Sequence, residues 1–146
     1  MNRQEVANKL SEILDDSNAG VLSTSDHNGT THTRWMTPIL LRGRKDVIFS
    51  ITPRNSNKVE QIKQHPEVTW MIQTRSLNQI ITIHGKTEVL DEPSLKTELL
   101  ETVGDKLTVL WRINDDLNDF VVLETVIEKG LYYKPLEGLY FAFDFS

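Results

Sequence analysis

The sequence predicts a mainly β fold, an antiparallel barrel or sandwich of about six or seven strands with three short helices. Short runs of β-branched and aromatic residues are separated by turn signals such as Asn28-Gly29, which favours a tight hairpin. Most of these runs follow one another directly, whereas parallel pairing would need a helical crossover between strands. One strand–helix–strand unit, at residues 47–73, is the exception.

The length and composition of the chain indicate one globular domain. Its 146 residues match the usual size of a single domain. Hydrophobic residues make up 38% and charged residues 25%, which argues against disorder. Because no repeat or linker divides the chain, we expect a single domain over residues 1–146.

Charge and residue usage exclude several function classes. With 21 acidic and 16 basic residues and no dense basic cluster, the chain is unsuited to nucleic acid. The absence of cysteine excludes disulfides and thiolate catalysis, and no histidines stand at a metal-ligand spacing. No apolar run approaches the roughly 20 residues of a membrane span, and no secretory signal opens the sequence. We expect a cytoplasmic protein without a metal or a membrane contact.

The period of the apolar residues changes along the chain. Residues 2–14 follow a helical pattern, and Asn2 with Glu5 has the spacing of a capping box. Gly85 indicates a bulge or a close-packing point within its strand. An acidic, polar loop is expected at 114–119. The predicted strands are 19–24, 31–41, 47–51, 67–73, 79–90 and 120–127, and the other helices are 55–64 and 94–103. Residues 131–133 and 139–145 are either short aromatic strands or a docked tail.

The segment from Thr52 to Lys58 leads from a buried strand into a helix, and helix N-termini attract anions. Lys58 in the first turn opposes the helix dipole, an effect that a bound phosphate would reverse. Hydroxyls at Thr52 and Ser56 add donors, and Arg54 adds charge. The segment is consistent with an anion site.

An ordinary capped helix explains the same residues. Asn55, Ser56 or Asn57 can provide the cap, and Asn57 with Glu60 has the capping-box spacing. Lys58 is then a solvated side chain. Both interpretations stay open on these residues alone.

Arg34 lies within a predicted strand, where alternation places it on one face with Met36 and places Trp35 and Thr37 on the other. A cation between such neighbours needs a partner if it is buried. It either faces solvent or a carboxylate, or it contacts a ligand phosphate or ring. The sequence contains no nucleophile elbow and no Ser-His-Asp pattern, so it identifies no catalytic residue.

In this order, the elements resemble the FMN-binding split-barrel proteins related to pyridoxamine 5′-phosphate oxidase, and most closely their general stress protein branch. The resemblance covers roughly residues 5–135. It rests on Ala19-Gly-Val-Leu-Ser-Thr, Arg34-Trp-Met36, Phe49-Ser-Ile-Thr52, Ser56-Asn-Lys58-Val and His65-Pro66-Glu-Val68. It implies an antiparallel split β-barrel of six to seven strands with short flanking helices, and a homodimer with FMN at the interface.

The resemblance also implies a set of cofactor contacts. Arg34 to Met36 would run along the flavin, and Thr52 with the Ser56-Asn57-Lys58 run would hold the phosphate. Gln79 would come from a neighbouring strand, and Trp111 would lie near the partner's flavin. The full implied set is Arg34, Trp35, Met36, Thr37, Ile51, Thr52, Ser56, Asn57, Lys58, Gln79 and Trp111.

Two departures from the family pattern bear on activity. Asn57 stands where the vitamin B6 oxidases place a second basic residue, and residues 132–138 lack their glycine- and arginine-containing signature. True pyridoxamine phosphate oxidation is therefore not expected. We expect an FMN-dependent oxidoreductase of unidentified substrate. The alternatives are a non-catalytic protein that binds flavin or another flat phosphorylated ligand, and a dimeric interaction protein without a ligand. The resemblance also admits haem or deazaflavin, which are ligands in related barrels.

Overall fold

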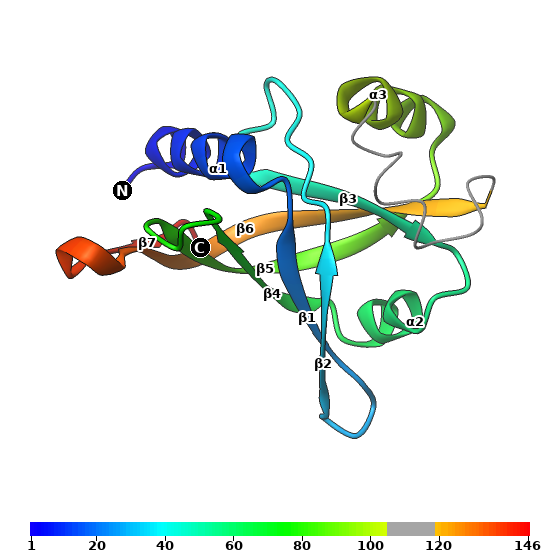
Figure 1. Ribbon diagram of the computed structural model, residues 1–146. Helices are drawn as coiled ribbons and strands as arrows, with labels where there is room; N and C mark the ends of the chain where they lie inside the picture. Colours follow the sequence, from blue (N-terminus) through cyan, green and yellow to red (C-terminus); the bar gives the residue numbers. More distant parts are fainter. Residues whose placement is uncertain (105–118) are drawn as a thin grey trace.

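The computed structural model describes residues 1–104 and 119–146 (Figure 1). Trp111 and all but the last residue of the acidic loop predicted at 114–119 lie outside the described residues. The elements are α1 (Arg3–Ser17), β1 (Gly20–Ser25), β2 (Thr31–Met36), β3 (Val47–Pro53), α2 (Asn57–Gln64), β4 (Glu67–Gln73), β5 (Ile80–Leu90), α3 (Pro93–Val103), β6 (Phe120–Lys134), the 3-10 turn η1 (Pro135–Glu137) and β7 (Leu139–Asp144).

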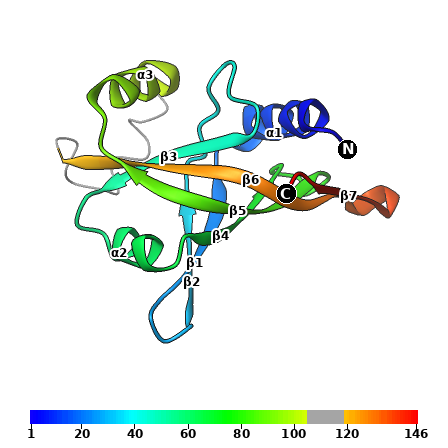
Figure 2. The same ribbon diagram turned by 180° about the vertical axis from the view of Figure 1, so that it is seen from behind.

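The strands form one seven-stranded sheet in the order β2-β1-β4-β5-β6-β3, with β7 paired to β6. Every pairing between these strands is antiparallel. The sheet curves so that its outer strands β2 and β3 approach each other, and an isolated bridge joins Ile39 to Phe49 (Figures 1 and 2). The predicted antiparallel split barrel with flanking helices is confirmed.

Two apolar clusters hold the barrel together. The first fills the barrel interior, where Leu22, Trp70 and Ile83 are fully buried, and α1 covers it with Leu10 and Ile13. Full burial of one such side chain contributes roughly 1.5–3 kcal/mol. α1 begins at the predicted capping box, in which the Asn2 side chain accepts from the Glu5 N–H and Glu5 accepts from the Asn2 N–H.

The second cluster lies between α3 and the β3–β6 pair. Leu99 and Val103 of α3 are buried against Phe49 of β3 and Val122 of β6. The two helices α1 and α3 therefore flank the connection from β2 to β3, while α2 lies apart from them beside β1 and β5 (Figure 1). β2 and α2 lie close together, because Arg34 of β2 contacts Gln61 of α2.

Some boundaries differ from the prediction. The strand expected at 31–41 ends at Met36, because Pro38 lacks an N–H and restricts the residue before it. The strand expected at 120–127 and residues 131–133 are one continuous strand, β6. A glycine is required at position 130 of β6, since a Cβ there would lie 2.1 Å from the Thr82 carbonyl oxygen.

Gly85 is the close-packing point that the sequence predicts. The β5–β6 register shifts between His84 and Gly85. A Cβ at position 85 would lie 2.2 Å from the Val126 carbonyl oxygen, so only glycine allows this backbone approach.

Candidate anion-binding site

The turn from β3 into α2 differs from the predicted capped helix. Ser56 is the N-cap residue, and its side chain makes no capping hydrogen bond. Its Oγ lies 3.3 Å from Thr52 Oγ1 instead. The capping box expected from Asn57 and Glu60 is therefore wrong, because Asn57 is the first helical residue rather than the cap. The hydroxyls of Thr52 and Ser56 face each other across the turn.

Lys58 is not a solvated helix residue. It is half-buried, and its Nζ donates a 2.8 Å hydrogen bond to Thr52 Oγ1. Burial, and secondly the positive charge of Arg34, lower the pKa of the Lys58 ammonium to about 8. The interpretation of this lysine as a freely hydrated charge is wrong.

Arg34 reaches toward α2 from the edge strand β2. Its Nη1 donates to Thr24 Oγ1 at 2.7 Å and to the Leu22 carbonyl at 3.3 Å. Its Nη2 lies 3.5 Å from Gln61 Oε1, which also accepts from Thr24 at 2.6 Å. The side chain is half-buried, and this burial lowers the pKa of the guanidinium. Its observed partners are a hydroxyl, an amide and a carbonyl, all neutral.

Thr24 and Gln61 were not identified from the sequence. Thr24 reaches Arg34 because Leu22 pairs with Arg34 across the β1–β2 hairpin, and this register becomes known only from the fold. Gln61 stands one helical turn after Lys58, at the spacing that places two side chains on one face. That spacing is the signal in the sequence that could have added Gln61.

Arg54 does not add its charge to this site. Its Nε donates to Asp119 at 2.7 Å and its Nη1 to Asp91 at 2.6 Å. These two ion pairs neutralise the guanidinium, so the expectation of a further cation beside Thr52 is wrong.

Trp35 and Met36 alternate as predicted, whereas Thr37 lies beyond the end of β2 and does not share the exposure of Trp35. Trp35 points outward and is 65% exposed, whereas Met36 packs against the barrel core. The Thr37 hydroxyl is buried and has no hydrogen-bond partner among the described residues. Ile51 packs with the α3 cluster, and Asn57 is exposed.

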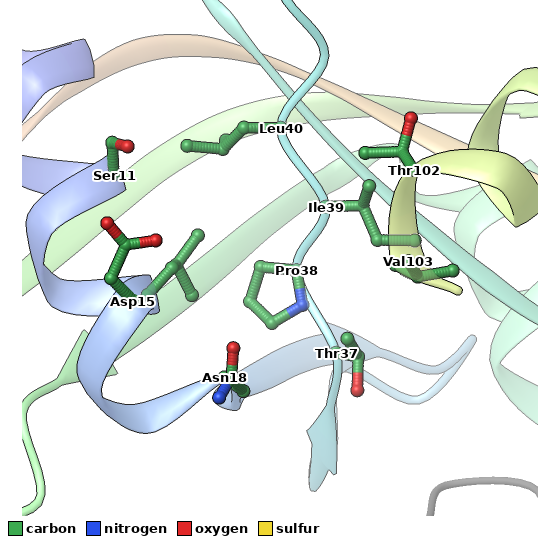
Figure 3. A pocket seen from close by; sticks show the side chains of 10 residues that line it. Ser11, Asp15, Asn18, Thr37, Pro38, Ile39, Leu40, Thr102 and Val103 are labelled. Carbon is green, nitrogen blue, oxygen red and sulfur yellow. The ribbon is translucent and has the colours of Figure 1, made fainter. Parts of the chain in front are cut away.

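Thr37 also lines a cavity of about 120 Å³ between α1 and α3. Figure 3 shows the connection after β2 crossing this space, with Ser11 and Asp15 of α1 on one side and Thr102 of α3 on the other. The cavity is smaller than the ~300–1,000 Å³ of most small-molecule sites.

Gln79 lies away from the two cations. It ends the turn after β4, and β4 runs for seven residues away from the end of α2. Its Oε1 accepts from the Tyr132 hydroxyl at 2.6 Å, and its Nε2 donates to Glu12 at 3.2 Å. The structure thus brings together Arg34, Thr52, Ser56 and Lys58 but not Gln79.

The cluster of Arg34, Lys58, Thr52 and Ser56 has the chemistry of an anion site. Neither Arg34 nor Lys58 forms an ion pair with a carboxylate in the part of the chain that the structure describes. Two half-buried cations, two hydroxyls and the N-terminus of α2 face one region. Such a group favours a bound anion, because the anion would form charge-assisted hydrogen bonds and relieve cation repulsion.

Residues 1–104 and 119–146 contain neither a metal-binding cluster nor a membrane-spanning helix. No three His, Asp or Glu side chains there are grouped so that they could hold a metal ion. No helix in the same residues is long and apolar enough to cross a membrane.

Comparison with known proteins identifies the family of the chain. The profile of the family described as pyridoxamine 5′-phosphate oxidase like matches residues 5–134. The chain belongs to this family. No curated protein sequence matches it at a significant level.

Several solved structures share the fold of this chain. A Clostridium acetobutylicum protein described as related to general stress protein 26 is 18% identical, with a TM-score of 0.75, covering 99% of this chain and 97% of that one. A Nostoc punctiforme protein described as FMN binding is 11% identical, with a TM-score of 0.66 and 95% coverage of both chains. A heme binding protein from Mycobacterium smegmatis is 17% identical, with a TM-score of 0.71, covering 95% of this chain and 57% of that one.

Proposed function

We propose that this protein binds FMN, and that Arg34 and Lys58 hold its phosphate together with Thr52 and Ser56. The observation that carries the proposal is the pair of half-buried cations whose observed partners are neutral. Partly buried cations without a counter-ion are unfavourable. A phosphate dianion would supply the missing charge and accept from both hydroxyls.

A flavin fits this chain better than a free anion does. The family includes a protein described as FMN binding. The buried Thr37 hydroxyl, three residues beyond Arg34, lacks a partner among the described residues and is available to a ligand that extends along β2. Three residues of extended chain span about 10 Å. Arg34, Trp35, Met36 and Thr37 would then border the flavin.

We further propose that two copies of the chain assemble with the flavin between them. The cavity of about 120 Å³ that Thr37 lines is by itself too small to enclose FMN. An apolar row, interrupted only by Thr82, also crosses the outer face of five adjacent strands, where register aligns Trp35, Val21, Met71, Thr82 and Leu131. Trp35, Met71 and Leu131 are 65%, 41% and 37% exposed. Exposed apolar surface of this kind marks interaction sites, and this row begins next to Arg34.

Bound FMN would supply hydride transfer, so the protein's own residues need only bind and orient it. The proposed activity is oxidoreduction of an unidentified substrate. A non-catalytic flavin-binding protein is the second candidate, because the hydrogen-bond partners of Arg34 and Lys58 include no group that titrates near neutral pH. True pyridoxamine phosphate oxidation is not proposed, since Asn57 replaces a basic residue of those enzymes.

The absorption spectrum of the purified protein tests the ligand. We expect a flavin spectrum, release of FMN on denaturation, and reconstitution of the apoprotein by added FMN. A haem spectrum, or failure to bind added FMN, would contradict the proposal. Anaerobic addition of NADH or NADPH then separates the two candidates: reduction of the flavin favours the oxidoreductase, and a flavin that neither donor reduces favours binding alone.

A further inference from the structure

Arg54 lies between the two hydroxyl residues of the anion site, Thr52 and Ser56, yet it points away from that site. Its guanidinium bridges Asp91, just after β5, and Asp119, just before β6, at 2.6 Å and 2.7 Å. Its backbone N–H also donates to the Asp119 carbonyl at 3.2 Å. Three hydrogen bonds thus fasten one exposed loop residue to two other segments.

The loop that Arg54 fastens is short, running only from the end of β3 at Pro53 to the start of α2 at Asn57. Arg54 and Asn55 are exposed, and Ser56 lacks a capping hydrogen bond. A backbone hydrogen bond of 3.1 Å from the Ser56 N–H to the Pro53 carbonyl closes the turn locally. The pairing of Pro53 with Phe120 and the burial of Val59 and Ile62 hold the two ends of this turn. The links to Asp91 and Asp119 add long-range hydrogen bonds to the exposed residue between those ends.

We propose that Arg54 is a positioning residue for the anion site, acting through its bridge to Asp91 and Asp119. The bridge holds residues 53–56 so that the Thr52 and Ser56 hydroxyls and the start of α2 stay aligned with Lys58. This inference rests on the proposed binding of the FMN phosphate. A positioning role differs from direct contact, since a guanidinium engaged by two carboxylates has little net charge to offer a phosphate.

Two variants distinguish positioning from direct contact. Arg54→Gln removes the bridge and the charge, whereas Asp91→Ala with Asp119→Ala removes both acceptors of the bridge and keeps the arginine. We expect both to weaken FMN binding between about threefold and tenfold, in line with the small free energies of exposed ion pairs. Arg54→Lys should restore part of the loss. Riboflavin, which lacks the phosphate, should bind the wild type and these variants equally.

The double carboxylate variant gives the sharper result. It removes two negative charges near the site, so simple electrostatics or a direct contact by Arg54 would strengthen FMN binding. Weaker binding supports positioning, and unchanged or stronger binding overturns it. Lys96→Gln is the matched control, because Lys96 also pairs with Asp91 but does not touch Arg54. It should leave FMN affinity unchanged.

Amide hydrogen exchange separates this inference from the proposed function. In Arg54→Gln without ligand, we expect faster exchange at residues 54–59 than in the wild type or Lys96→Gln. If the wild type binds FMN while Arg54→Gln changes neither affinity nor exchange, the positioning role is wrong. If exchange rises in Arg54→Gln but the wild type binds FMN no more tightly than riboflavin, the bridge orders the loop and the FMN proposal is wrong.

Discussion

The charge of Arg34 on the edge strand β2 acts on Lys58 in the first turn of α2. Together with burial, the larger cause, it lowers the pKa of the Lys58 ammonium to about 8. The strand and the helix come together only in the fold, and Gln61 of the same helix accepts a hydrogen bond from Arg34. Two repelling cations held side by side are unfavourable unless an anion joins them.

The affinity for FMN should depend on pH through Lys58. A bound phosphate raises the pKa of Lys58 above 8. At a pH above the Lys58 pKa of the free protein, FMN binding therefore requires Lys58 to take up a proton. We expect FMN affinity to fall about tenfold or more between pH 7 and pH 9.5. Isothermal titration calorimetry at several pH values measures this, with riboflavin as the control for changes in the ring. A flat FMN profile would show that Lys58 does not contact the phosphate.

Removing the Lys58 charge should stabilise the protein without ligand. The folded-state pKa of Lys58, about 8, lies below the ordinary lysine pKa of 10.5, so the unfolded chain binds more protons between these two pH values. The free energy of unfolding of the wild type should therefore rise between about pH 8 and pH 10.5. After discounting for solvent screening, Lys58→Met should be more stable than wild type by about 1 kcal/mol at neutral pH.

Urea denaturation at pH 7 and at pH 10 measures this difference, which should shrink at the higher pH. Lys63→Met, an exposed lysine of the same helix, is the control and should change the stability by less than about 0.5 kcal/mol. A destabilised Lys58→Met protein at neutral pH would mean that Lys58 is a structural residue rather than part of a ligand site.

Arg34→Gln should weaken FMN binding by more than about tenfold, since it removes one charge-assisted contact to the phosphate. Arg42→Gln, at an exposed arginine of the turn before β3, serves as the control and should bind FMN as the wild type does. Thermal denaturation of both variants verifies that each is folded. Equal FMN affinities for the two variants would remove Arg34 from the site.

The apolar row on the outer face should mediate self-association. Trp35→Ser with Met71→Ser removes two exposed apolar side chains of the row, so we expect a shift from dimer to monomer in sedimentation velocity. Leu136→Ser, at an 86% exposed leucine outside the row, should leave the dimer intact. A double variant that sediments like the wild type would place the interface elsewhere.

Gly85→Ala should destabilise the barrel by about 2–4 kcal/mol, because its Cβ would lie 2.2 Å from the Val126 carbonyl oxygen and backbone must move. Lys86→Ala, at the neighbouring exposed residue, should cost less than about 0.5 kcal/mol. Chemical denaturation compares the two. Equal stabilities would contradict the close approach of β5 and β6.

Local patterns predict much of this fold. Alternation gives the bounds of β4 exactly as observed at 67–73, and the capping box at Asn2 correctly predicts the start of α1. The sequence separates 120–127 from 131–133, whereas β6 is continuous through Gly130, where the facing Thr82 carbonyl requires glycine. Such a contact between β5 and β6 depends on tertiary structure.

The candidate site likewise depends partly on local sequence patterns and partly on tertiary structure. Helix and strand patterns identify Lys58 and Arg34 as unusual cations, but only the fold brings them together. Arg54 was assigned to the site by proximity in sequence, and its partners at positions 91 and 119 lie 37 and 65 residues away. Pairings over such separations cannot be read from local periodicity, so the direction of a loop side chain has to come from the structure.

The most direct test of the central claim compares FMN with riboflavin on the wild-type apoprotein by equilibrium titration. The two ligands share the flavin ring and the ribityl chain, so their difference isolates the phosphate. Two charge-assisted contacts, from Arg34 and Lys58, predict FMN binding at least about 100-fold tighter near pH 7. Equal affinities, or no binding of FMN, would contradict the assignment of this site to a flavin phosphate.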